Sequence, residues 1–153
     1  QFSQGSQMRI NFRIEQSVRR AETLIKSGQY GQVIQITEVA LRGRGLLEPK
    51  LWRLNAVAAG SLGDHWQACQ SLWRALSLKF DEPTLANYIT ALFALGYYER
   101  AAWLLKGSYK FLGKPARNIL INTIVEAIWI EAIKAEALPM EAIQDVIDQQ
   151  STF

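Results

Sequence analysis

Apolar residues recur at intervals of three and four along most of the chain. Two stripes show the spacing most clearly: Ile14, Val18, Ala21 and Leu24/Ile25, and then Val33, Ile36 and Ala40. This spacing places apolar side chains on one face of an α-helix, because successive residues turn by about 100°. No stretch shows the alternation of apolar and polar residues that is typical of a strand. The pattern therefore predicts an all-α protein.

Prolines and glycines mark the expected ends of these helices. Four prolines stand where a helix is predicted to begin: Pro49, Pro83, Pro115 and Pro139. Proline is tolerated in a first helical turn because its missing N–H has no intrahelical partner there. Glycines mark the predicted breaks between helices: Gly28, Gly43, Gly45, Gly63, Gly96 and Gly113.

Three of the breaks look alike. They read KSGQYGQV (residues 26–33), SLGDHWQA (61–68) and ALGYYERA (94–101). Their glycines, Gly28, Gly63 and Gly96, are 35 and 33 residues apart, and Pro49 and Pro83 are 34 apart. A period near 34 with two helices in each period is a signature of helical-repeat proteins.

On these residues the chain resembles the tetratricopeptide repeat family. The match is best from Pro49 to Glu82, where Trp52 and the Gly63–Asp64 pair fall at the family's tryptophan and turn positions. The small, bulky and small positions of its second helix hold Ala68, Leu72 and Ala75. The next repeat shares Gly96, Tyr98, Ala101 and Leu105, with Ser108 as its last small residue; the first shares Gly28, Tyr30 and Ala40, with Val33 replacing an alanine.

The resemblance implies three to four antiparallel helical hairpins stacked as a right-handed superhelix. We expect a flexible segment over residues 1–12 and a single domain over 13–153, with repeats at about 13–48, 49–82, 83–114 and 115–149. Small residues at Ala68 and Ala75 would let the two helices of a hairpin approach closely, with Leu72 filling the groove between repeats. Three tryptophans are expected in the core: Trp52, Trp73 and Trp103.

Composition narrows the functional classes. The chain has 153 residues, 49% of them hydrophobic, which suits a globular core. Its one cysteine, Cys69, excludes an internal disulfide and a multi-cysteine zinc site, and is compatible with a reducing compartment. No run of 18 uncharged apolar residues predicts a membrane span, and no secretory signal pattern stands out. We expect a cytoplasmic protein, although the chain begins at Gln1 rather than Met, which is compatible with a missing native start.

The charges are unevenly distributed. Residues 1–117 hold sixteen Lys/Arg and eight Asp/Glu, whereas residues 118–153 hold Lys134 and six acids. The two parts therefore carry +8 and −5, within a net charge of +3. Such asymmetry fits a charged partner, docking of one end on the other, or two solvated faces of opposite sign.

No constellation of catalytic or metal-binding residues stands out, and we expect neither an enzyme nor a cofactor. The single His65 excludes chemistry that needs two histidines, and it stands at a position where the family has an aromatic turn residue. The stretch Arg42–Gly45 lacks the strand, the third glycine and the Gly-Lys-Ser/Thr of a phosphate loop. Glu126 and Glu131 are five residues apart, so a helix would direct them apart rather than pair them.

In the resembling family, the first helix of each hairpin lines a concave groove that binds peptides. Carried over to this sequence, the groove residues are Arg19, Glu22, Lys26, Lys50, Arg53, Val57, Asn87, Thr90 and Phe93. The groove would be basic at one end and more apolar at the other. The Lys/Asn constellation with which some members clamp a C-terminal carboxylate is largely missing, so this ligand is not expected.

The stretch NILINTIVEAIWIEAI (residues 118–133) is apolar on nearly every side of a predicted helix. Helices of this kind are covered on two sides, and three covers are open here: the chain's own last helix, a second copy of the chain, or a partner. Ile121, Ile124, Ile128 and Trp129 are the expected apolar interface. We predict that residues 116–149 form a homodimer or a complex with a partner.

Together these features favour a non-enzymatic protein-binding module, a scaffold or chaperone that receives a peptide or an amphipathic helix. In size and repeat number the chain is similar to small bacterial tetratricopeptide chaperones of secretion systems. One alternative is RNA binding by a basic repeat array, which the +8 body supports but the absence of a dense basic run disfavours. The other is a structural fragment of a larger repeat protein.

Overall fold

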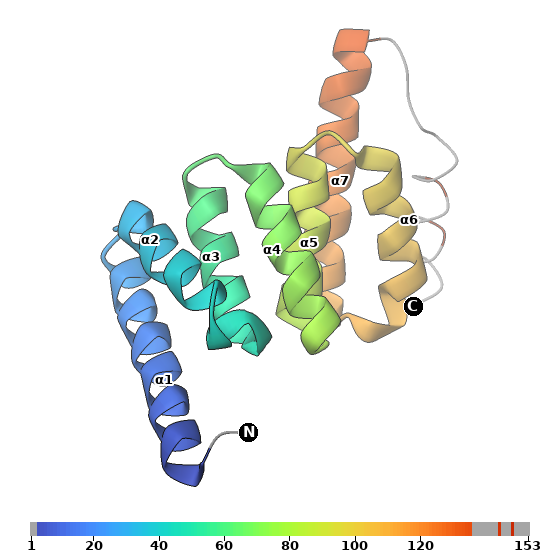
Figure 1. Ribbon diagram of the computed structural model, residues 1–153. Helices are drawn as coiled ribbons and strands as arrows, with labels where there is room; N and C mark the ends of the chain where they lie inside the picture. Colours follow the sequence, from blue (N-terminus) through green and yellow to red (C-terminus); the bar gives the residue numbers. More distant parts are fainter. Residues whose placement is uncertain (1–2, 136–143, 145–147, 149–153) are drawn as a thin grey trace. The chain divides into compact units, whose positions relative to one another are not determined.

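The computed structural model describes residues 3–135, 144 and 148 (Figure 1). Over these residues every regular element is helical, which confirms the all-α prediction. The elements are α1 (Gln4–Lys26), α2 (Tyr30–Leu41), η1 (Arg44–Leu47), α3 (Pro49–Ser61), α4 (His65–Leu78), α5 (Glu82–Ala94), α6 (Tyr98–Ser108), η2 (Tyr109–Phe111) and α7 (Lys114–Ala135), where η marks a short 3₁₀ helix.

The chain divides into two compact units, where the sequence predicts one domain over 13–153. Unit 1 comprises Gln1–Thr84 and unit 2 comprises Leu85–Phe153. The division lies in the first turn of α5, close to the predicted repeat boundary at residue 83.

The prolines begin helices as predicted. Pro49 is the first residue of α3, and Pro83 and Pro115 are the second residues of α5 and α7. The fourth, Pro139, lies outside the described residues, as does most of the predicted fourth repeat.

The three similar turns have the same backbone geometry. Gly28, Gly63 and Gly96 each have a positive φ, of 73°, 84° and 84°. In each turn the glycine N–H donates to the carbonyl three residues earlier, and the next N–H donates to the carbonyl five residues before it. This is the Schellman pattern, in which a left-handed residue closes a helix and satisfies its last carbonyls. The next helix then begins two residues after each glycine.

The N-terminal segment differs from its prediction. Residues 1–12 were expected to be flexible, whereas α1 begins at Gln4 and runs for 23 residues. The Ser3 hydroxyl caps it by accepting the backbone N–H of Ser6 at 3.2 Å, a contact that stabilises a helix start. Because α2 has only 12 residues, the first half of α1 extends past it (Figure 1). Met8 and Phe12 are exposed on this extension.

Small residues occupy the centre of unit 1. Ala68, Leu72 and Ala75 are buried in α4, as predicted, and α3 packs against α4, α2 and α1. Ala58 and Ala59 of α3 are also buried, so the backbones of α3 and α4 come close together.

Two of the three tryptophans that the sequence places in the core are exposed. Trp73 is 58% exposed and Trp103 is 43% exposed, so the expectation that both are core residues is wrong. The closely packed alanines leave no space for an indole at the centre of unit 1. Trp52 is half-buried, and its indole N–H donates to the Leu46 carbonyl at 2.9 Å.

A polar network lies among the buried residues of unit 1. The Asn55 amide of α3 donates to the Thr37 hydroxyl of α2 at 3.0 Å. Its carbonyl oxygen accepts the Ser71 hydroxyl of α4 at 2.7 Å and the Gln67 amide at 3.1 Å. Asn55, Thr37 and Ser71 are completely buried. One asparagine therefore links three helices.

In unit 2 the largest fully buried side chains that the structure describes are aliphatic. Ile89 of α5, Leu105 of α6, Leu112 after η2 and Ile124 of α7 are fully buried. Helix α6 contacts α7, and Tyr109 of η2 is buried beside them.

Candidate partner-binding cleft

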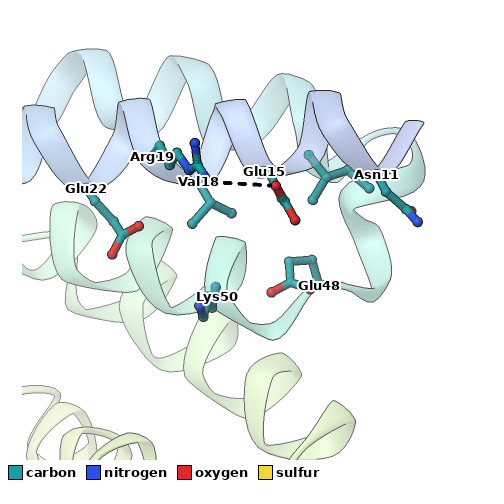
Figure 2. A pocket seen from close by; sticks show the side chains of 8 residues that line it. Asn11, Glu15, Val18, Arg19, Glu22, Glu48 and Lys50 are labelled. Carbon is teal, nitrogen blue, oxygen red and sulfur yellow. Dashed lines mark ion pairs between the residues drawn. The ribbon is translucent and has the colours of Figure 1, made fainter. Parts of the chain in front are cut away.

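A cleft of about 460 Å³ lies in unit 1 beside α1 and the start of α3. Eight residues line it: Asn11, Ile14, Glu15, Val18, Arg19, Glu22, Glu48 and Lys50. Figure 2 shows Glu15, Val18 and Glu22 extending from α1 toward the segment that carries Glu48 and Lys50. The cleft therefore has one long wall, from α1, and a short one, from the beginning of α3.

Helical periodicity explains how α1 forms its wall. Asn11, Glu15, Val18 and Glu22 follow one another at intervals of four, three and four, so they share one face of the helix. Val18 is buried and makes an apolar floor, packed with Leu41 and Leu51. The polar residues on either side of it are exposed to solvent. The wall thus presents charges around a small apolar centre.

The charges lining the cleft are mixed. Three carboxylates, from Glu15, Glu22 and Glu48, face two cations, from Arg19 and Lys50. Arg19 and Glu15 form an exposed ion pair with 3.9 Å between Nη2 and Oε2. The sequence predicts a basic end of the groove here, but the cleft is not basic. Glu15 and Glu48, which the resemblance did not identify as lining residues, supply two of its three carboxylates.

Three predicted groove residues meet in this cleft: Arg19, Glu22 and Lys50. Lys26 and Val57 are exposed in unit 1 but do not line the cleft. Sequence analysis missed Asn11, Glu15 and Glu48. The first two could have been found from the helical spacing, since Glu15 is four residues before Arg19 and Asn11 is four before Glu15.

Arg53 is engaged by another contact. Its guanidinium lies 3.6 Å from the Asp81 carboxylate, and both side chains are about two-thirds buried. Asp81 also accepts the Thr84 N–H at 3.0 Å and the Thr84 hydroxyl at 2.8 Å, which caps α5. Partial burial acts to raise the pKa of Asp81, but the Thr84 hydrogen bonds and the charges of Arg53 and Lys79 outweigh it, so the pKa is lowered. Arg53 therefore serves a structural contact rather than an open groove.

The groove residues predicted for unit 2 are divided between surface and core. Asn87 and Thr90 are exposed, and the Thr90 hydroxyl donates to the Ala86 carbonyl at 2.9 Å. Phe93 is only 5% exposed, and its ring lies 5.8 Å from that of Tyr98. The placement of Phe93 on a binding surface is wrong, since its side chain closes the turn between α5 and α6.

The predicted apolar interface on α7 is also partly internal. Ile121 and Ile124 are buried, so neither is accessible to a partner. The side chains of Ile128 and Trp129 lie outside the described residues. Ile119, which directly precedes the buried Leu120 and Ile121 on α7, is 66% exposed.

Within the described part of the chain, no three His, Cys, Asp or Glu residues cluster closely enough to hold a metal ion. None of the helices described there has both the length and the apolarity that a bilayer span requires. Cys69 is buried, as expected for a packing residue.

No protein-family model, no curated protein and no solved structure matches this chain.

Proposed function

We propose that this chain is a non-enzymatic module that binds a segment of a partner protein in the cleft between α1 and α3. The observation that carries the proposal is the cleft itself, which surrounds the buried Val18 with charged side chains of both signs. Binding sites of this type combine an apolar centre with a few polar groups that orient the ligand. Short peptide segments, extended or helical, suit such a groove between helices.

We further infer that the hairpins are tetratricopeptide-like repeats that form a right-handed superhelix. The identical turns at Gly28, Gly63 and Gly96 support this inference. So do the residues five positions after each glycine, Val33, Ala68 and Ala101, which are all buried. A scaffold or chaperone role follows from such an array, because it offers a groove without a reaction centre.

The chemistry of the cleft favours a peptide over RNA. Three carboxylates repel a phosphate backbone, and two cations among them cannot supply the excess of positive charge that nucleic-acid binding requires. A peptide with both signs of charge can instead pair Lys or Arg with the glutamates and Asp or Glu with Arg19 and Lys50.

The test uses a displayed library of random peptides selected on the full chain. Arg19→Glu and Lys50→Glu should each weaken the selected peptides about tenfold, since a reversed charge removes an attraction and adds a repulsion. Arg20→Glu is the matched control, because Arg20 is the next residue of α1, is exposed and does not line the cleft.

Equal binding by the Arg19→Glu, Lys50→Glu and Arg20→Glu variants would place the peptide site elsewhere. Circular dichroism checks that all three retain the helical content of the wild type, as expected for exposed positions.

A further inference from the structure

The outer face of α4 carries two exposed tryptophans. Trp66 is 56% exposed and Trp73 is 58% exposed, and they lie seven residues apart on one side of the helix. Leu62, in the turn before α4, is also 58% exposed. Gln70 and Ser77 complete the stripe on α4, with intervals of four, three and four from Trp66 to Ser77. Large apolar side chains gathered in this way commonly mark an interaction surface.

No charged residue belongs to this stripe, and the nearest charged side chains, Asp64 and Arg74, make contacts of their own. The Asp64 carboxylate caps α4 by accepting the Gln67 N–H at 3.1 Å. The Arg74 guanidinium lies over the Trp52 ring of α3, 6.0 Å from its centroid. The stripe therefore presents indole and amide groups to whatever covers it.

We propose that a second copy of this chain covers the outer face of α4, with the two α4 helices antiparallel. A two-fold axis beside Gln70 places Trp66 of each copy against Trp73 of the other, since the two tryptophans are nearly equidistant from Gln70. Such an interface is isologous, with the same patch used by both copies. Paired indoles favour offset or edge-to-face contacts.

The polar groups suit this arrangement. The Gln70 side chain can both donate and accept, so two Gln70 amides beside the axis satisfy each other. The absence of charge on the stripe means that two copies meet without like-charge repulsion. A lipid surface would instead favour basic residues flanking the aromatic ones, and Arg74, the cation next to Trp73, lies over the Trp52 ring.

The area limits the strength of association. Four half-exposed tryptophans, each with about 150–250 Å² to bury in full, contribute on the order of 350–550 Å² at this contact. With Leu62, Gln70 and their neighbours, the interface falls below the roughly 1,200–2,000 Å² of stable specific complexes. The dimer should therefore be weak and visible only as concentration rises.

The experiment measures the mass of the full chain by sedimentation velocity from low micromolar to submillimolar concentration. The wild-type mass should rise toward that of a dimer. Gln70→Glu and Gln70→Lys should each weaken association about tenfold or more, since equal charges then meet at the axis. An equimolar mixture of these two variants should recover association, because opposite charges then face each other.

Gln35→Glu is the matched control, as an exposed glutamine of α2 outside the stripe, and should associate like the wild type. A Trp66→Ala/Trp73→Ala variant should remain monomeric with unchanged helicity. Peptides that bind the α1–α3 cleft should bind the Gln70 variants normally, so this proposal and the proposed function can fail separately.

Three results would overturn the proposal. The first is a wild-type chain that stays monomeric at every concentration. The second is association that neither Gln70 variant weakens, or that their mixture does not recover. The third concerns a chain that does not self-associate but whose tryptophan emission shifts when phosphatidylcholine or phosphatidylglycerol vesicles are added. If the double tryptophan variant loses this shift, the stripe is a lipid contact.

Discussion

In unit 1 the helices α2, α3 and α4 are joined by buried hydroxyl and amide groups, whereas the largest fully buried side chains described in unit 2 are aliphatic. Thr37, Asn55 and Ser71 are as deeply buried as Ile89 and Leu105. Hydrogen bonds are directional, so the network in unit 1 fixes how far each helix is rotated and shifted against its neighbours. Apolar burial has no direction, so the aliphatic side chains described in unit 2 position their helices through their shapes.

The largest loss of stability is expected from a substitution among the buried aliphatic side chains of unit 2. Leu105→Ala removes a fully buried side chain of α6 and should lower the free energy of unfolding by about 3–5 kcal/mol through lost transfer energy and a cavity. Chemical denaturation measures the loss, and hydrogen exchange at the α6 amides localises it. Ile119→Ala is the control, since Ile119 is exposed, and it should change stability by less than about 0.5 kcal/mol. Similar values for both variants would show that Leu105 is not part of a packed core.

The polar centre should tolerate replacement of one partner poorly. Asn55→Leu removes the acceptor of the Ser71 hydroxyl and one of the two acceptors of the Gln67 amide, which also donates to the Ser71 hydroxyl. The substitution should cost about 2–3 kcal/mol in denaturation experiments. A Thr37→Val/Asn55→Leu/Ser71→Ala variant should be less destabilised than the sum of its single variants, because it removes most of the polar partners together. Additive losses would mean that the three residues act independently and that the contrast with unit 2 is only one of composition.

The turns provide a feature shared by both units. Gly63→Ala and Gly96→Ala should each cost about 1–2 kcal/mol, because a Cβ is strained at positive φ. No neighbouring atom would meet the added Cβ at either position, so the cost arises from the backbone. Gly107→Ala, a helical and exposed control, should stabilise the chain by about 0.5–1 kcal/mol. Unequal losses at Gly63 and Gly96 in thermal unfolding would show that the two turns are not equivalent.

The smallest effect is expected at the edge of unit 1, where a charged contact is partly solvated. Asp81 has a lowered pKa in the folded chain, so its contribution to stability is present above the ordinary carboxyl pKa and is lost as the pH falls below about 4. Asp81→Asn should cost less than about 1 kcal/mol near neutral pH, because solvent screens the Arg53 pair. The difference between variant and wild type in denaturation midpoint should shrink in acid. A difference that grew in acid would reverse the inferred sign of the pKa shift.

Sequence analysis could predict the helices and turns because they depend on local signals. Proline at a helix start and glycine at positive φ act within a few residues, so Pro49 and Gly63 were located correctly. The cores were harder, since burial depends on which helix faces meet. Trp73 stands beside the buried Leu72 on α4 but points outward, and Asn55, which looks like a surface residue in sequence, lies at the centre.

The cleft was partly predictable, because the helical periodicity of α1 is also a local signal. Arg19 and Glu22 share a face of α1 that periodicity reveals. Glu48 lies before α3 in a segment with no periodicity, and only the packing of α3 on α1 places it at the cleft. Glu48 adds the third carboxylate, so that carboxylates outnumber cations in the cleft.

The three equivalent turns have a consequence for how the chain can change its length. Helices α3 and α5 have 13 residues each, and each begins 14 residues before its turn glycine. The unequal glycine intervals arise only in the following helix and linker, where residues 42–48 separate α2 from α3 and residues 79–81 separate α4 from α5. A duplicated or deleted segment of one interval would therefore carry its own closing geometry with it, and the linker alone would need to adjust. The hairpin, rather than the single residue, is the natural step by which this architecture can be extended or shortened.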